Sequence, residues 1–349
     1  VAFDEFFRQY RKDTGSERKL TPDMDEYVDK IKVISDFAAK YDMGICLSLL
    51  SPLELGSAYK KQTGHGGRWV AYKVGFRDPQ TGKFSLPVWQ QLAWTSPVKL
   101  TGVKAYAFRE TPLGGSPFRA VVPADIVPVE QVKYEATDTL GDEVTGAAMD
   151  TRLLRVYCDR PQLPGYNRVM VVLEYETQEM DYFNADASAF LKRLMKKYKD
   201  KGVNLTALYS DEMHIQQDWG YFGHHEGGQF AERYLTQSMA DAYAEKFGQP
   251  FDDRYMLYFA YGAPYFEPTA NAVVNVQYVM GPSPEDIHRT FLLRDRYYRM
   301  LNNGVVDLFC DAKSYAEGLF GRELRTAAHA SWAQSPTIDL WNTEKQPSN

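Results

Sequence analysis

VNLTALYSDEMHIQQDWGYF, residues 203–222, is the stretch that decides the fold prediction. Its first half alternates in character like a β-strand and ends abruptly in acidic residues. Asp211 and Glu212 follow the strand directly, and Trp219 lies a few residues further on. In a (β/α)8 barrel all strands direct their carboxyl ends to one mouth, where the chemistry takes place. We therefore expect the end of this strand to carry a functional site.

The combination of acids and aromatics favours a carbohydrate site. Sugars present apolar C–H faces and many hydroxyl groups, so their sites combine aromatic side chains with carboxylates, and glycoside cleavage usually needs two carboxyl groups. Glu212 is the candidate catalytic residue. The alternative is that Asp211 caps a turn and Glu212 is solvated, as in an ordinary surface loop.

The flanking segments alternate between strand and helix patterns. A strand is predicted at residues 168–176 and a helix at 187–198, and an earlier helix at 24–41 leads into an apolar strand at 43–50. This alternation is expected of a parallel barrel or a doubly wound sheet. The fold class we predict is α/β, a (β/α)8 TIM-type barrel that is either complete or lacks some strands.

A β-rich region interrupts the alternation. From about Trp94 to Pro164, short β-like runs are separated by Gly and Pro clusters, without a helical period. The domain prediction is therefore a first part of the barrel at 1–95, an inserted β-rich subdomain at 96–165, and a continuation of the barrel with the acidic site at 166–349.

The remaining segments are a loop, two helices and a strand. A long polar loop is predicted at 51–69. Ser283 is expected to cap a helix that Gly304 ends, and a second helix is expected at about 305–319. The run at 324–334 is interpreted as a further strand.

Composition limits the classes of function. The chain has 349 residues, a formal net charge of -6 and basic residues spread along its length, so neither a nucleic-acid footprint nor a basic membrane patch is indicated. No stretch approaches the roughly 20 apolar residues of a membrane span. Three distant cysteines indicate neither a disulfide framework nor a zinc motif. The oligomeric state is left open.

The start of the chain bears on the compartment. It begins at Val1 without an initiator methionine, which favours a processed product or a fragment. If a signal peptide has been removed, a secreted or periplasmic location is favoured over a cytoplasmic one.

Four groups of segments together carry a family resemblance. They are SLLSPLELG with GHGGRW, the inserted β region, EYETQEMDYFNADASAFLKRLMKKY leading into LTALYSDEMH, and RTAAHASWAQSPTIDLWN. In this order they resemble the barrel of the α-L-rhamnosidase-like glycoside hydrolases, family 106. Members of that family are longer and carry accessory β domains, so the sugar could differ from rhamnose.

The resemblance implies site residues and a mechanism. It implies Glu212 as the general acid and a glutamate from a later strand as the base of an inverting reaction. We expect Glu344 in that second role, with Asp339 as the next candidate. Calcium assists sugar binding in family members, so calcium is the one cofactor that the resemblance suggests. A carboxylate separation of about 6.5–9.5 Å would indicate inversion and about 5–5.5 Å retention.

Other polar and aromatic side chains are predicted to bind the carbohydrate substrate. Glu176 ends another predicted strand, with Glu174 close by, and both could instead hold a basic residue. The complete set of expected substrate-binding residues is Asp211, His214, Trp219, His329, Trp332 and Glu176.

Two alternatives come from other classes. The first is a hydrolytic zinc or manganese site, for which the nitrogen and oxygen donors are Asp211, His214, His224, His225, Glu226 and His329. No HExxH or HxH motif supports it. The second is a sugar-binding module without catalysis, in which the aromatic stretch at 256–278 provides the stacking surface.

Overall fold

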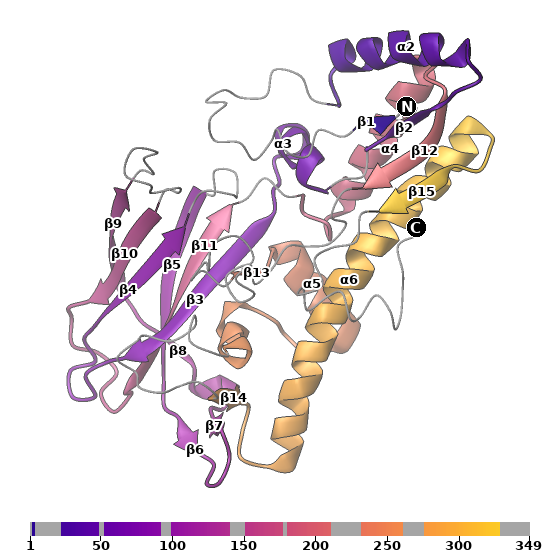
Figure 1. Cartoon of the computed structure of the whole chain (residues 1–349). Helices are drawn as coiled ribbons and strands as arrows, with labels where there is room; N and C mark the ends of the chain where they lie inside the picture. Colours follow the sequence, from indigo (N-terminus) through magenta and orange to yellow (C-terminus); the bar gives the residue numbers. More distant parts are fainter. Residues whose placement is uncertain are drawn as a thin grey trace.

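The computed structural model describes residues 2–3, 22–48, 52–91, 99–139, 151–176, 180–210, 232–260 and 276–328. Within these ranges the chain forms a β-rich part and a smaller parallel sheet accompanied by helices (Figure 1). The long helix α6 (Pro284–Phe320) begins near β14 (Gln277–Val279) and ends beside the parallel sheet. It therefore spans both parts of the molecule.

Four strands form the parallel sheet, in the order β1-β2-β12-β15. They are β1 (Ala2–Phe3), β2 (Ile45–Leu47), β12 (Leu205–Ser210) and β15 (Arg325–Ala328). Helix α2 (Asp25–Ala39) precedes β2, α4 (Ala185–Asp200) precedes β12, and α6 precedes β15. The parallel strand predicted within residues 43–50 is thus confirmed, and so are the helices predicted at 24–41 and 187–198.

The predicted (β/α)8 barrel is wrong. The described residues contain five α-helices and no closed barrel, whereas the barrel needs eight strand–helix units. The strand predicted at 168–176 is present as β11 (Arg168–Glu176), but both of its neighbours are antiparallel to it. Its apolar run reflects burial on both faces. The central strand of a sandwich meets that condition as well as a parallel strand does, so the pattern could not separate the two.

Two antiparallel sheets and a small mixed sheet build the β-rich part. The antiparallel sheets have the strand orders β13-β3-β11-β5-β8 and β4-β10-β9. The mixed sheet has the order β14-β7-β6, in which β7 is parallel to β14 and antiparallel to β6. The strands are β3 (Arg68–Phe76), β4 (Phe84–Gln91), β5 (Lys99–Phe108), β6 (Thr111–Pro112), β7 (Phe118–Ala120), β8 (Val127–Pro128), β9 (Lys133–Thr139), β10 (Thr151–Cys158) and β13 (Glu232–Tyr234).

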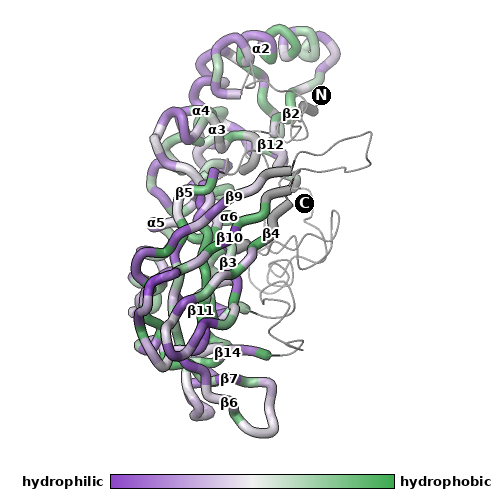
Figure 2. The backbone as a smooth tube through the Cα atoms, turned by 90° about the vertical axis from the view of Figure 1, so that its left-hand side faces the viewer, coloured by the Kyte–Doolittle hydropathy of each residue, from purple (hydrophilic) through white to green (hydrophobic). Residues whose placement is uncertain are grey.

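Strand β11 is the wall between two hydrophobic cores. Val169, Val171 and Leu173 face the core between the two larger sheets, whereas Met170 and Val172 face a core that continues through the helices to the parallel sheet. Figure 2 shows the contrast along the tube, with β11 mostly hydrophobic and β9 mostly hydrophilic. The second core joins the β-rich part to the helical part.

Side chains cap the starts of both α4 and α6. Asn184 accepts a hydrogen bond from the backbone N–H of Asp186 at the start of α4. Ser283 and Asp286 form a reciprocal capping box at the start of α6, which confirms the predicted cap. One face of α4 is buried, formed by Phe190, Leu191, Leu194, Met195 and Tyr198.

Gly304 does not end a helix. Helix α6 continues through it to Phe320 and ends at Gly321, which adopts the left-handed conformation with φ of 67°. Gly304 instead provides space for a ring, because a Cβ atom there would lie 2.6 Å from Cε1 of Phe183. The glycine serves tertiary packing, which local sequence rules cannot reveal.

Exchanging two glycines of α6 for alanine should have opposite effects. Gly304→Ala is expected to cost about 1–3 kcal/mol, because the new methyl group would overlap Phe183. Gly318→Ala has nothing within 4 Å of the added atom and should be neutral or stabilising by up to about 1 kcal/mol. Urea unfolding of both variants measures the difference. Equal effects would show that Phe183 does not restrict position 304.

A helix replaces most of the loop predicted at 51–69. Helix α3 (Pro52–Thr63) buries Leu55, Ala58 and Tyr59 at helical spacing. Proline at its first position and lysines in its last turn are helix signals that the abundance of glycine and polar residues obscured.

Three further short elements complete the described chain. They are α5 (Gln237–Phe247) and the 3-10 helices η2 (Pro123–Asp125) and η3 (Asp253–Phe259). Among the described helices, none combines the length and the apolar character needed to cross a bilayer.

Candidate functional site

The carboxyl edge of the parallel sheet is the first candidate site. Ser210, the last residue of β12, is paired in register with Ala328, the last residue of β15. On the other side of β12, Leu208 is paired with Leu47 at the end of β2. The three strands therefore end at the same edge. Ligands of open parallel sheets bind outside this edge.

Ser48 lies at this edge, directly after β2. Its side chain is 5% exposed, and its hydroxyl oxygen has no hydrogen-bond partner in the described part of the chain. Buried hydroxyl groups usually have a partner. A polar group that approaches this edge would find a hydroxyl that can pair with it.

Most residues that the sequence predicts for the site lie outside the described residues. The catalytic candidates Glu212 and Glu344 are among them, as is Asp339. So are the substrate-binding candidates Asp211, His214, Trp219, His329 and Trp332, and the further metal-ligand candidates His224, His225 and Glu226. In sequence, Asp211 and Glu212 follow directly after Ser210, and His329 follows directly after Ala328.

A second acidic pair escaped the sequence analysis. Asp4 and Glu5 follow directly after Phe3, the last residue of β1, in the same way that Asp211 and Glu212 follow β12. Asp4 and Glu5 also lie outside the described residues. The signal that could have found them is the repeated motif of a short apolar run followed by Asp-Glu.

Of the expected substrate-binding set, Glu176 alone lies within the described residues. It ends β11 and forms an ion pair with Lys60 of α3, and its side chain is 35% exposed. The pair joins the helix after the parallel strand β2 to the central strand of the β-rich part. Glu176 therefore pairs with a basic residue, which is the alternative role predicted for it from the sequence.

A cluster of charged side chains lies on the face of the larger sheet that also carries Glu176. The Lys104 ammonium lies 2.7 Å from the Glu174 carboxylate and 2.9 Å from that of Asp253. Arg68 also pairs with Glu174, and its Nη2 lies 3.9 Å from Asp253. The hydroxyl of Tyr106 donates to Asp253 over 2.8 Å. The cluster ties η3 to strands β3, β5 and β11.

The electrostatics of the cluster keep Asp253 ionised. Burial raises the pKa of Asp253, but hydrogen bonds from Lys104 and Tyr106 and the charge of Arg68 outweigh it, so the pKa is lowered. Burial lowers the pKa of Lys104, and its bonds to Asp253 and Glu174 outweigh this and raise the pKa. A general acid needs the opposite shift. The cluster therefore serves to hold the elements together rather than to transfer protons.

Asp253→Asn should destabilise the protein in a pH-dependent manner. The loss is expected to be about 1–3 kcal/mol at pH 7, because charge-assisted hydrogen bonds to a side chain only 8% exposed are weakened. The folded-state pKa of Asp253 is lowered, so its contribution is complete above the unfolded value near 4 and is lost as pH falls through the folded value. Urea unfolding from pH 7 to pH 2.5 should show the two stability curves converging at low pH.

Asp252→Asn is the matched control for this experiment. Asp252 pairs with Arg254 at the surface, with 38% of its side chain exposed, and it caps η3 in a way that asparagine can reproduce. The free energy of unfolding of Asp252→Asn should differ from that of the parent by no more than about 1 kcal/mol. A constant gap between the parent and Asp253→Asn down to pH 2.5 would contradict the assigned role of Asp253.

The described residues contain no group of three or more His, Cys, Asp or Glu side chains placed to hold a metal ion. All residues of the zinc or manganese alternative lie outside these ranges. That alternative remains a prediction.

Comparison with protein-family models, with curated proteins and with solved structures gives no match. The function is therefore proposed from the residues of this chain and from the resemblance that its segments carry.

Proposed function

We propose that this protein is a glycoside hydrolase that cleaves plant or algal oligosaccharides or polysaccharides, with an α-L-rhamnosidase-like activity, and that Glu212 is its general acid. The observation that supports this most is the register of β12 and β15, which end side by side at Ser210 and Ala328. The residues that follow in sequence are Asp211 with Glu212, and His329. An acid pair and an imidazole after adjacent parallel strands suit a sugar-cleaving site.

The reaction requires two carboxyl groups. Glu212 would donate a proton to the glycosidic oxygen as the C–O bond breaks, and a second carboxylate would remove a proton from the water that attacks the anomeric carbon. Trp219, Trp332 and the two histidines His214 and His329 would contact ring faces and hydroxyl groups. Calcium, if bound, would assist sugar binding.

The topology suggests where to look for the second carboxylate. One strand, β2, separates β1 from β12, so these two strands lie roughly 10 Å apart across the sheet. Phe3 and Leu208 both pair with Leu47, and β12 continues from Leu208 to Ser210. The lateral spacing is close to the upper end of the carboxylate separation in inverting enzymes, about 9.5 Å. Asp4 and Glu5 follow β1 in sequence and are therefore candidates beside Glu344.

A sugar-binding module without catalysis is the alternative function. Its proposed stacking surface at 256–278 is weakened by burial, because Tyr258 and Tyr278 are fully buried and Phe259 is 4% exposed. These rings contribute to the core. The catalytic proposal does not depend on them.

The test is hydrolysis of a panel of aryl glycosides and of plant and algal oligosaccharides by the full chain, with added calcium and with chelator. Release of one sugar from the panel would support the proposal and identify the substrate, and the anomer formed first would separate inversion from retention. A metal analysis of the same sample would test the zinc alternative. No hydrolysis of any substrate, with sugar binding retained, would favour the binding module.

A further inference from the structure

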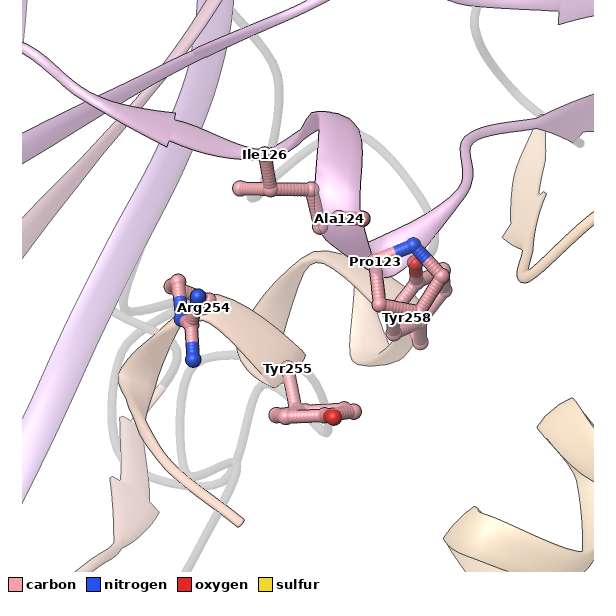
Figure 3. Close-up of a pocket in the computed structure, with 6 residues that line it drawn as sticks. All are labelled: Pro123, Ala124, Ile126, Arg254, Tyr255 and Tyr258. Atoms are coloured by element: carbon pink, nitrogen blue, oxygen red, sulfur yellow. The ribbon is translucent and has the colours of Figure 1, made fainter. Parts of the chain in front are cut away.

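A small cavity lies between η2 and η3, in the β-rich part. Its volume is about 190 Å³, and it is lined by Pro123, Ala124, Ile126, Arg254, Tyr255 and Tyr258. Figure 3 shows Ile126 and Ala124 on one side, the Tyr255 ring across from them, and Arg254 at the flank. The cavity is smaller than the roughly 300–1,000 Å³ pockets that hold drug-sized ligands, so it suits a single ring.

The aromatic walls are held in place. The hydroxyl of Tyr258 donates to the backbone carbonyl of Val121 over 2.7 Å. The ring of Tyr255 stacks on that of Phe251, with centroids 5.8 Å apart and planes 18° from parallel. Fixed rings lose little conformational entropy when a ligand binds.

A neutralised ion pair forms the polar flank. Arg254 donates from Nε over 3.0 Å to one oxygen of Asp252 and from Nη2 over 2.6 Å to the other. Both side chains remain partly exposed, at 41% and 38%. Arg254 lines the cavity and offers N–H donors to it, and Asp252 neutralises the charge of its guanidinium.

We propose that this cavity binds one neutral saccharide ring. The apolar C–H face of a sugar would pack on Tyr255 and Pro123, as aromatic rings in sugar sites do. Sugar hydroxyl groups would accept hydrogen bonds from Arg254, whose charge Asp252 neutralises. An anion would have to displace Asp252 from the guanidinium, and a plain aromatic ring would leave Arg254 without a hydrogen-bond acceptor at the cavity side.

This site goes beyond the proposed hydrolysis. It lies on the β-rich part rather than at the edge of the parallel sheet, and binding there requires no contribution from Glu212. A second sugar site would hold a long substrate to the protein and raise the effective concentration of its glycosidic bonds near the carboxyl edge.

The test is ligand-observed NMR of the full chain with free L-rhamnose, L-fucose, D-galactose, D-glucose, D-mannose and D-xylose. Two variants alter the cavity without removing core residues. Arg254→Met removes the donors, and Ala124→Trp fills the cavity from an exposed position. Arg155→Met removes another surface arginine that pairs with an acid, Glu135, and is the matched control. Thermal unfolding of each variant checks the fold.

We expect at least one sugar to bind the parent and Arg155→Met equally, and to bind Arg254→Met and Ala124→Trp at least tenfold more weakly. The inference is overturned if no sugar binds at 50 mM, or if a bound sugar is unaffected by both cavity variants. Benzoate or inorganic phosphate binding in the cavity in place of any sugar would also overturn it.

Discussion

Glu212→Gln is expected to lower the turnover of glycosides with unactivated leaving groups by about 10²–10⁴-fold, the usual contribution of a general acid. Glutamine has nearly the same shape but cannot donate a proton to the departing oxygen. The sugar should bind with little change, because the substitution removes a proton donor and not a large contact. Initial rates on a natural oligosaccharide, measured together with sugar binding, check this result.

The leaving group provides an internal control. A nitrophenolate departs without protonation, so Glu212→Gln should slow nitrophenyl glycosides much less than oligosaccharides. Asp211→Asn is the neighbouring control and should retain the response to the leaving group that the parent shows. Equal losses on both classes of substrate would contradict a general-acid role for Glu212.

The base should behave differently from the acid. Its neutral variant should slow activated and unactivated substrates alike, because water activation is needed for both. Glu344→Gln, Asp339→Asn, Asp4→Asn and Glu5→Gln compare the four candidates directly. The variant with a uniform loss identifies the base, and four unaffected variants would exclude all of them.

Arg294→Ala is expected to destabilise the protein by on the order of 3 kcal/mol or more, since several buried acceptors would lose their donor. Arg294 of α6 donates from Nε to the carbonyl of Tyr258 over 2.6 Å and from Nη2 to that of Tyr278 over 3.3 Å. A third bond, from Nη1, reaches the side-chain oxygen of Gln277 over 2.8 Å. This one side chain therefore fastens η3 and β14 to α6.

Burial of Arg294 does not remove its charge. Burial is the main cause that lowers its pKa to about 10, which leaves the guanidinium protonated at neutral pH. The carbonyl dipoles around it stabilise that charge. Urea unfolding at pH 7 measures the loss in Arg294→Ala as a lower midpoint with an unchanged slope.

Arg289→Ala is the matched control on the same helix. Half of the Arg289 side chain is exposed, and it pairs with Asp286 one turn away at 3.3 Å. Exposed pairs of this kind contribute about 0–1 kcal/mol. A loss in Arg294→Ala no larger than that in Arg289→Ala would show that the three bonds do not hold these elements together.

Local rules predicted the elements that depend on near neighbours. The capping box at Ser283 uses residues three apart, and the buried stripe of α4 uses residues three and four apart. The strands at 43–50 and 168–176 were recognised from their apolar runs. Where one sequence pattern fits two structures, the prediction was wrong. Strand β11 was expected in a parallel barrel and lies in an antiparallel sheet, and the loop predicted at 51–69 is mostly a helix.

The candidate site was predictable only in part. The acid pair after β12 was visible because strand alternation and Asp211 with Glu212 are contiguous in sequence. The pairing of β12 with β15 links residues more than a hundred positions apart, and the same holds for Lys60 with Glu176 and Lys104 with Asp253. No local signal records such partners.

The sequence by itself determined the presence of its best-capped helices and of its most apolar strands, because those depend on spacings of two to four residues. Tertiary structure alone decided the direction of β11, the presence of Gly304 inside a helix against Phe183, and the joining of two cores across one strand. These three features depend on which surfaces pack against each other. A buried strand or a glycine has the same sequence pattern whichever neighbour covers it, so local sequence cannot predict them.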